Sequence, residues 1–417
     1  MQKAFLLSIG LLLLGGGLRA QTSPRKAVFI IVDGIPADVV EKVPTPHLDA
    51  IAKVGGYTRA YTGGEAGGYS ETPTISAVGY NSLLTGTWAN KHNVWGNGIK
   101  DPNYHYPTIF RLFKDQYPDK KTAVFSTWLD NRTKLIGEGL AATGHVQVDY
   151  DFDGFELDTV RFPHDRQSEY IHQIDELVTD EAARYLRAEG PDLSWVYLEY
   201  TDDMGHRFGD SPQQTRAVEI VDQQVGRIWA ALQERQQRFG EEWMILITTD
   251  HGRDAKTGKD HGGQSERERT IWITTNLKDL NPHFHNDQPG MVDILPTMTR
   301  FLGIDVPRAT LLELDGVPLT GPVSLTDPQV QYQNGKLQLS WNALEKKGDV
   351  QVWVSTTNHV KDRGQQDAYQ RLATVPLKKE AYTLDVSTLP SEFYKVVLEG
   401  SHNAVNRWVR VTKSPTP

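Results

Sequence analysis

Three apolar runs constrain the fold of this chain more than any other feature, because polar side chains follow each of them directly. The runs cover residues 27–32, 195–200 and 244–249. Continuous apolar runs of this length are typical of strands that are buried on both faces of a parallel sheet. The sequence therefore predicts a parallel sheet with polar side chains gathered beyond its carboxyl ends.

Six residues of the types that bind metals follow these runs or come shortly after the last one. They are Asp33, Asp202, His206, Asp250, His251 and His261. One aspartate alone would be explained as a helix cap, but six such residues in this order favour a common site. Carboxylate oxygens together with imidazole nitrogens suit two divalent cations, and zinc in particular. Two adjacent metals favour in-line displacement at phosphorus or sulfur.

The region 25–320 alternates strand-like and helix-like segments, which indicates an α/β sandwich. Two further apolar runs, 122–126 and 271–274, are expected to join the sheet. The clearest helical segments are 45–54, 168–188 and 213–238. The irregular, aromatic and acidic segment 127–170 has two interpretations. It is either a cap insertion over the site or a long loop and helix at the sheet edge.

The composition changes after Gly321, and residues 328–417 are predicted to form a small β-sandwich. Short alternating runs separated by turns support this; they are 336–341, 349–354, 382–386, 394–398 and 407–411. The segment from Leu389 to Tyr394 resembles the turn before a late strand of fibronectin type III domains, where a tyrosine makes a corner hydrogen bond. The resemblance implies a fibronectin-III-like sandwich.

Residues 1–20 have the pattern of a signal peptide: Lys3, an apolar run over 4–14, and a cleavage site expected after Ala20. We expect export to a periplasm or secretion, with no membrane span after cleavage; the alternative is an uncleaved anchor. The chain has no cysteine, so disulfides and a thiolate nucleophile are excluded. Its net charge of −9 argues against a nucleic-acid duplex as partner.

A hydroxyl nucleophile is expected in the segment 72–86, which runs from a polar turn into a helical pattern. The start of a helix offers free backbone N–H groups and a positive dipole end, which favour anions. Three hydroxyls compete there, those of Thr72, Thr74 and Ser76, and their spacing alone does not separate them.

Five short motifs resemble those of the alkaline phosphatase superfamily, most closely its nucleotide pyrophosphatase/phosphodiesterase branch, the type I phosphodiesterase family. They are Val32-Asp33-Gly34, Leu84-Thr85-Gly86, Asp202-x-x-Gly205-His206, Thr249-Asp250-His251-Gly252 and the later His261. The resemblance covers about residues 26–303. It implies a three-layer alkaline-phosphatase-like sandwich with a mostly parallel sheet.

The resemblance also implies roles for individual residues. The family nucleophile lies nine residues before the threonine of the Thr-Gly pair, which is Ser76 here, with Thr74 as the alternative. The phosphodiesterase branch usually has threonine at that position, so serine is a departure. One metal site is implied for Asp202, His206 and His261, and a second for Asp33, Asp250 and His251 with Ser76.

Asn97 and Arg132 bear on the choice of substrate. Asn97 lies 21 residues after Ser76, where the family has an asparagine that donates to a phosphoryl oxygen. A neutral amide suits a singly charged diester, although Asn97-Gly98 also fits a tight turn. Related monoesterases have Lys-x-Arg where this chain has Asp130-Asn131-Arg132. Arg132 is therefore either a surface salt-bridge residue or a substrate ligand for monoesters.

The predicted activity is hydrolysis of a phosphodiester or pyrophosphate bond in a small phosphorylated substrate such as a nucleotide, through a covalent phospho-serine. A phosphomonoesterase on the same site is the main alternative. A sulfatase is disfavoured because Val78 and Tyr80 replace the proline and arginine of the sulfatase motif. A binding protein without catalytic activity is disfavoured by the intact set of ligands.

Overall fold

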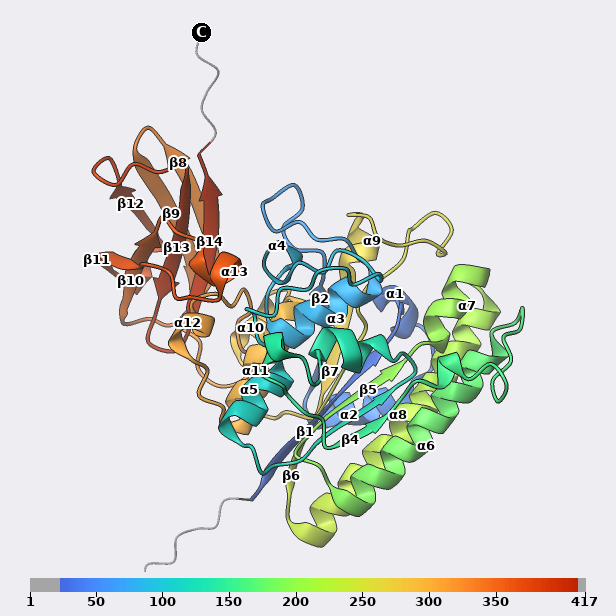
Figure 1. The fold of residues 1–417 in the computed structure, drawn as a ribbon. Coiled ribbons are helices and arrows are strands. Elements are labelled where there is room, and N and C mark those ends of the chain that lie inside the picture. Colours follow the sequence, from blue (N-terminus) through green and yellow to red (C-terminus); the bar gives the residue numbers. More distant parts are fainter. Residues whose placement is uncertain (1–22, 412–417) are drawn as a thin grey trace, which may run out of the picture.

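The computed structural model describes residues 23–411, and its larger part is built around one seven-stranded sheet (Figure 1). The strand order is β2-β7-β6-β1-β5-β3-β4. The strands are β1 (Arg25–Val32), β2 (Gly56–Tyr61), β3 (Thr122–Ser126), β4 (Tyr150–Phe152), β5 (Leu193–Leu198), β6 (Glu242–Thr248) and β7 (Thr270–Thr275). The five adjacent strands β6, β1, β5, β3 and β4 are parallel to one another, which confirms the mostly parallel sheet.

Two strands depart from the expected pattern. β7 pairs antiparallel with β6, because a strand that is buried on both faces has the same apolar pattern in either direction. β2, which the sequence did not indicate, pairs antiparallel with β7 at the edge of the sheet. Its residues are mostly half-buried or exposed, so it has no continuous apolar run.

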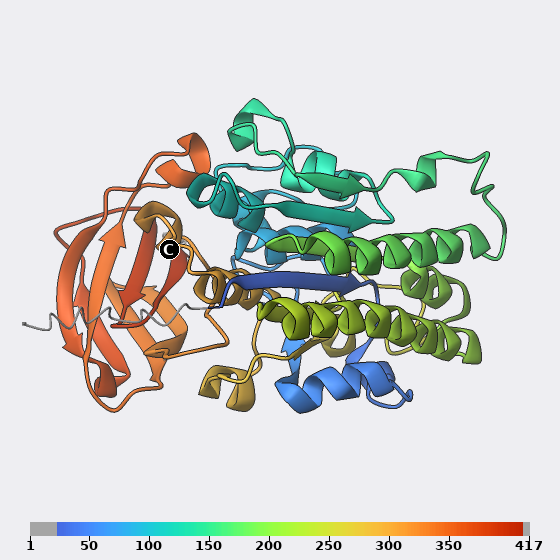
Figure 2. The ribbon, with the colours of Figure 1, turned by 90° about the horizontal axis from the view of Figure 1, so that it is seen from below.

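Helices cover both faces of the sheet and make it the middle of three layers (Figure 2). One face packs against α2 (Pro46–Val54), α6 (Glu169–Glu189) and α8 (Pro212–Phe239). The other packs against α3 (Ser76–Thr85), α5 (Ile109–Gln116) and α11 (Ile294–Leu302). Alternate residues of β1 serve the two cores: Phe29 and Ile31 face α3, whereas Val28 and Ile30 face α8.

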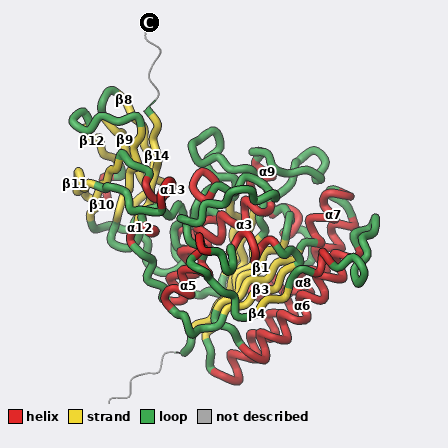
Figure 3. Tube along the Cα trace, viewed as in Figure 1, coloured by secondary structure: helices red, strands yellow, loops and turns green. Residues whose placement is uncertain are grey.

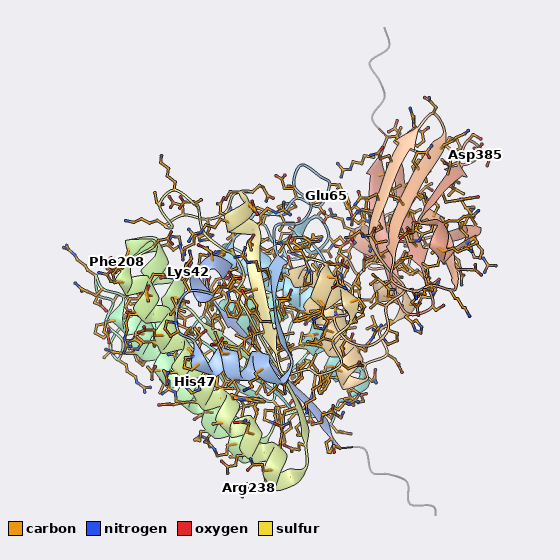
Figure 4. All side chains as sticks on the ribbon, turned by 180° about the vertical axis from the view of Figure 1, so that it is seen from behind. Lys42, His47, Glu65, Phe208, Arg238 and Asp385 are labelled. Atoms are coloured by element: carbon orange, nitrogen blue, oxygen red, sulfur yellow. The ribbon has the colours of Figure 1, made fainter. Side chains whose placement is uncertain are left out.

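The remaining helices of the described residues are short; most connect these elements, and the last two lie in the C-terminal part of the molecule. They are α1 (Ala37–Val40), α4 (Ala89–His92), η1 (Asn131–Ile136), η2 (Ala141–Thr143), η3 (Phe155–Leu157), α7 (Tyr200–Phe208), α9 (Glu266–Arg269), α10 (Pro282–Asn286), η4 (Met291–Asp293), α12 (Arg308–Leu311), α13 (His359–Arg363) and η5 (Leu377–Lys379). In Figure 4, Phe208 at the end of α7 marks the side of the molecule where the parallel strands end. Arg238 marks the far end of α8.

The segment 127–170 is mainly loop (Figure 3). It contributes β4 to the edge of the sheet beside β3. At its start the ring of Trp128 meets the ring of Tyr80 on α3 edge-on, with centroids 6.3 Å apart. The segment therefore contacts the helix that begins at Ser76.

Two further sheets form the C-terminal part of the molecule. One has the order β11-β10-β13-β14 and the other β12-β9-β8, all antiparallel. The strands are β8 (Leu325–Gln333), β9 (Lys336–Ala343), β10 (Asp349–Ser355), β11 (Gln370–Pro376), β12 (Ala381–Asp385), β13 (Phe393–Glu399) and β14 (Ala404–Arg410). The Tyr394 hydroxyl donates to the Leu389 carbonyl at 2.8 Å and accepts from the Ser391 N–H at 3.0 Å.

The signal peptide expected at residues 1–20 lies outside the described residues, as do the last residues, 412–417, of the expected sandwich domain. Within residues 23–411, no helix combines the length and apolar character that crossing a bilayer requires.

Candidate metal centre

The six expected ligands lie together at the carboxyl ends of three neighbouring parallel strands, β6, β1 and β5. Asp33 directly follows β1, and Asp250 and His251 follow β6. Asp202 and His206 lie one turn apart on α7, which begins just after β5. His261 comes from the loop between β6 and α9. Residues far apart in the sequence thus meet where an open α/β sheet binds ligands.

The first group consists of Asp33, Asp250 and His251, whose ligand atoms all lie within 4.8 Å of one another. Asp33 Oδ1, Asp250 Oδ2 and His251 Nε2 are buried and have no hydrogen-bond partner. Buried polar atoms rarely lack a partner, and three that converge in this way fit a metal ion.

In each of these three side chains, the other oxygen or ring nitrogen makes hydrogen bonds within the protein. Asp33 Oδ2 accepts hydrogen bonds from the hydroxyls of Tyr80 and Tyr197. Asp250 Oδ1 accepts from the Gly34 N–H at 3.1 Å. His251 Nδ1 lies 2.9 Å from the Gly252 carbonyl, to which it donates, so the lone pair of its Nε2 is left for a metal.

The second group consists of Asp202, His206 and His261, again with ligand atoms within 4.8 Å of one another. His206 Nε2 lies 3.1 Å from His261 Nε2 and 3.3 Å from Asp202 Oδ2. His261 Nδ1 donates to the Thr74 carbonyl at 2.8 Å, which turns its Nε2 lone pair toward the other two ligands.

The three carboxylates repel one another in a buried setting. Burial and the charges of Asp250 and Asp202 raise the pKa of Asp33 well above its usual value. Burial raises the pKa of Asp250 to about 7. Burial alone would also raise the pKa of Asp202, but Arg253, His206 and His251 together outweigh it, and that pKa lies below its usual value. Bound cations would offset this concentration of negative charge.

Arg253 is a functional residue that the sequence did not single out. Its guanidinium is 1% exposed and donates to the carbonyls of Gly34 at 3.0 Å, Lys259 at 2.9 Å and Asp202 at 2.7 Å, and to Asp202 Oδ1. Arg253 itself lies two residues after His251. One side chain therefore ties together the four segments that carry the ligands.

Two glycines make room for this guanidinium. A methyl group on Gly34 would lie 2.7 Å from Arg253 Nη2, and one on Gly205 would lie 2.2 Å from its central carbon. Gly205 belongs to the motif between Asp202 and His206, inside a helix where glycine is otherwise unfavourable. A glycine within a helical ligand motif was the available signal that a large side chain packs there.

Ser76 is the first residue of α3, and α3 lies directly against the first ligand group. A methyl group on Gly79 would be 3.1 Å from Asp250 Cβ, and Tyr80 bonds Asp33. Residues three and four apart share one side of a helix, so Ser76 lies on the same side as these contacts. Its side chain is almost buried.

Thr74 and Asn97 flank this helix start. The Thr74 hydroxyl donates to the Gly263 carbonyl and accepts from the Gly262 N–H, both at 2.9 Å. Asn97 Oδ1 accepts from the Ala77 N–H at 3.0 Å, which leaves the two N–H donors of its amide for another partner.

Arg132 lies within the segment 127–170 and is surrounded by carboxylates. Its guanidinium pairs with Asp153 at 2.7 Å, Glu138 at 2.5 Å and Asp151 at 3.3 Å. These ion pairs occupy both edges of the guanidinium.

A mostly parallel α/β sheet with two His/Asp groups at its carboxyl ends is the arrangement of the alkaline phosphatase superfamily. Residues 27–291 match the family model for type I phosphodiesterase/nucleotide pyrophosphatase. The chain belongs to that family.

Comparison with curated proteins agrees with this assignment. The chain is 24% identical over 339 residues to ectonucleotide pyrophosphatase/phosphodiesterase family member 5 of Homo sapiens, covering 79% of this chain and 65% of the relative. It is 24% identical over 251 residues to family member 7 of Homo sapiens, covering 57% of this chain and 50% of the relative. The chain thus spans only about half to two thirds of the length of these relatives.

Among solved structures, Ps i-CgsB in complex with k-i-k-neocarrahexaose is similar with a TM-score of 0.50 and 16% identity, covering 77% of this chain and 82% of that one. At this identity the likeness concerns the fold alone.

Proposed function

We propose that this protein is a two-metal hydrolase that cleaves phosphodiester or pyrophosphate bonds through a covalent phospho-serine at Ser76. The observation that carries the proposal is the convergence of three buried, unpartnered ligand atoms from Asp33, Asp250 and His251 beside the helix that begins at Ser76. Family membership supports the reaction class.

Each residue has a role in this proposal. Asp33, Asp250 and His251, with Ser76, would hold one metal; Asp202, His206 and His261 would hold the other. When bound, the metals supply Lewis acidity, which lowers the pKa of a bound hydroxyl or water and stabilises developing negative charge. The Ser76 oxygen loses its proton and attacks phosphorus, and the bond to the leaving oxygen breaks in line, so that the leaving group departs and takes up a proton. Water then attacks phosphorus from the side that the leaving group has vacated, which breaks the bond to Ser76, releases the phosphate product and restores the serine hydroxyl.

The surroundings of the two candidate hydroxyls support Ser76 over Thr74. The Thr74 hydroxyl is fully buried and already makes two hydrogen bonds to the loop of His261. Removing its proton would leave the Gly263 carbonyl without its donor. Ser76, by contrast, stands at the start of α3, where the helix dipole favours an alkoxide or phosphate.

The polar groups near Ser76 support a diester over a monoester. The Asn97 side chain is neutral, and it accepts a hydrogen bond from the N–H of Ala77, the residue that follows Ser76. Arg132 makes ion pairs with three carboxylates, and the guanidinium of Arg253 donates its hydrogen bonds to acceptors within the protein. A doubly charged monoester would be bound more strongly by a site with an available cationic side chain. Phosphomonoester hydrolysis is the second candidate, favoured only if Arg132 leaves its ion pairs.

The remaining parts of the proposal concern metal, substrate, location and domains. The ligand set suits zinc. The names of the curated relatives point to nucleotides as the small phosphorylated substrates. The pattern of residues 1–20 supports export to a periplasm or secretion. We divide the mature chain into a catalytic domain over 25–320, with 127–170 as its cap, and a sandwich domain from 328.

We further propose that the sandwich is fibronectin-III-like. A three-stranded sheet and a four-stranded sheet, together with the corner hydrogen bond of Tyr394, support this.

The test compares bis-4-nitrophenyl phosphate with 4-nitrophenyl phosphate, before and after chelation and with zinc restored. We expect zinc-dependent turnover that favours the diester. Ser76→Ala should lose turnover with its fold and zinc content unchanged, and acid-quenched wild type should give a phosphorylated Ser76 peptide by mass spectrometry. Preference for the monoester would reverse the order of the two candidate activities. A phosphopeptide that contains Thr74 instead would reject Ser76.

A further inference from the structure

A buried cluster of charges lies between the α/β body and the C-terminal sandwich. It consists of Lys91 on α4, Lys395 on β13, and Glu313, Asp315 and Asp367, all with side chains at most 1% exposed. Charges this deeply buried are tolerated only when they are paired and hydrogen-bonded, and removing one partner is strongly destabilising. The cluster therefore ties α4 of the α/β body and β13 of the sandwich, by separate ion pairs, to residues 313–315, which lie between the two parts along the chain.

Lys91 is the member of the cluster that reaches from the catalytic part into the sandwich. Its ammonium donates to the Glu313 carbonyl at 2.7 Å, Asp315 Oδ1 at 2.6 Å and Asn406 Oδ1 at 2.8 Å, which uses all three donors. Asn406 on β14 in turn donates to the Leu314 carbonyl at 2.6 Å. The sandwich thus fixes α4 through one lysine.

A second contact lies a short distance further along the chain. Asn103 Nδ2 donates to the Lys361 carbonyl at 2.9 Å, and His105 Nδ1 lies 3.0 Å from the same oxygen. Lys361 belongs to α13 of the sandwich, which lies beside α4 in Figure 1. The loop 93–98 therefore runs between two points that are docked on the sandwich.

Only the start of this loop has firm support of its own, since Val94 is buried in the core and Asn93 Nδ2 donates to the Asp101 carbonyl at 2.7 Å. Asn97 and Gly98 are exposed, and a methyl group on Gly96 would meet no atom within 4 Å. The position of the exposed tip, residues 95–98, consequently depends on how the rest of the loop is held.

The loop leads directly to the candidate active site. His92, next to Lys91, lies 3.0 Å from Ser82 Oγ on α3 through Nε2 and accepts from the Val94 N–H through Nδ1. At the tip of the loop, Asn97 accepts a hydrogen bond from the Ala77 N–H on α3. A shift of α4 would therefore move Asn97 relative to the start of α3.

We propose that the C-terminal sandwich braces the loop 93–98, and that Lys91 is the positioning residue through which it sets Asn97 for a phosphoryl oxygen. The sandwich then belongs to the catalytic apparatus and is more than an appended binding module. The kinetic part of this inference rests on the proposed role of Asn97 in diester hydrolysis.

The test uses the full chain with three variants. Asn406→Leu removes an acceptor of Lys91 from the sandwich side, and Lys91→Met removes the ammonium itself. Lys395→Met is the matched control, because Lys395 is equally buried in the same cluster but makes its ion pairs with Glu313 and Asp367. For each variant, kcat and KM on bis-4-nitrophenyl phosphate, zinc content, thermal midpoint and hydrogen exchange of the amides in 93–98 are measured.

We expect Asn406→Leu and Lys91→Met to lower kcat/KM about 10-fold to 100-fold, as misplaced binding groups do, with zinc content unchanged. Exchange of the 93–98 amides and of the Ala77 N–H should accelerate. Lys395→Met should lower the thermal midpoint without either effect. In an Asn97→Ala background, adding Asn406→Leu should cause no further loss of kcat/KM.

Wild-type kcat/KM and exchange in a folded Asn406→Leu variant would overturn the brace, as would an equal loss of kcat/KM with and without Asn97. If Asn97→Ala alone leaves diester hydrolysis unchanged, the assignment of Asn97 fails instead. The exchange measurement then decides the brace independently of catalysis.

Discussion

At the scale of single residues, each carboxylate of the candidate site divides its two oxygens between the protein and the space for a metal. Asp33 gives Oδ2 to two tyrosines, Asp250 gives Oδ1 to a backbone N–H, and Asp202 gives Oδ1 to Arg253. The second oxygen of each points toward the other ligands of its group. Hydrogen bonds of this kind fix the orientation of a ligand before the metal arrives.

Replacing Arg253 should therefore weaken metal binding. Arg253→Met removes the bonds to Asp202 and to the backbone of two other ligand segments, at Gly34 and Lys259, and we expect zinc affinity to fall about 10-fold to 100-fold. Competition with a chromophoric chelator measures it. Arg267→Met is the control, because Arg267 is a partly buried arginine of the same region that pairs with Asp38 and Asp210, which are not ligands. Unchanged zinc affinity in folded Arg253→Met would contradict the prediction.

At the scale of elements, two loops that are far apart in the sequence form one unit. The turn before α3 holds the loop of His261 through Thr74, whose carbonyl and hydroxyl both bond it. Gln264 adds a bond from Nε2 to the Thr72 carbonyl at 2.8 Å. His261, the last of the six candidate ligands along the chain, is thus positioned by the segment that leads into the helix of Ser76.

Thr74→Val should separate this positioning role from nucleophilic attack. The isosteric side chain loses two buried hydrogen bonds, so we expect weaker zinc binding and a lower thermal midpoint, while excess zinc restores most of kcat. Thr74→Ser, which keeps the hydroxyl, should behave like wild type. Steady-state kinetics over a zinc titration provides the measurement. A complete loss of turnover at saturating zinc in Thr74→Val would instead identify Thr74 as the nucleophile.

At the scale of the whole molecule, a buried imidazolium joins α10 to the segment that leads to the sandwich. His283 lies 2.9 Å from both Asp287 and Asp293. Asp293 also accepts from the Val317 N–H at 2.7 Å. Burial alone would lower the pKa of His283, but the two carboxylates outweigh it and raise the pKa to about 10.

This cluster predicts a definite pH dependence of stability. Because the folded pKa of about 10 exceeds the usual 6.5, the imidazolium stabilises the fold fully below pH 6.5 and loses this effect as the pH rises toward 10. The loss in unfolding free energy caused by His283→Gln should therefore be largest in mildly acidic buffer and shrink in alkaline buffer. Urea unfolding at several pH values measures it.

The exposed His285 on the same helix supplies the control. His285→Gln should change the unfolding free energy little at any pH. A His283→Gln effect that stays constant across the pH range would mean that the ion pairs do not stabilise the fold.

Much of the α/β part was predictable because burial leaves a direct record in the sequence. The buried strands β1, β5 and β6 and the amphipathic helix α8 were expected within a few residues of their observed ends. β2, β4, β8 and β11 were missed because their residues alternate or are partly exposed, so no apolar run marks them. The antiparallel direction of β7 could not be predicted from the sequence either. The connecting chain, and not the pattern of side chains, determines whether two strands pair parallel or antiparallel.

The sequence by itself determined the parallel core, the six ligand types and their place after the strands, because apolar runs and carboxylates at strand ends are local features. Only the tertiary structure decided which atoms of those ligands face each other. It alone revealed that Arg253 joins all four ligand segments and that Lys91 links the loop of Asn97 to the sandwich. These contacts join residues far apart along the chain, and a local pattern carries no information about which distant backbone carbonyl or carboxylate a buried cation will meet.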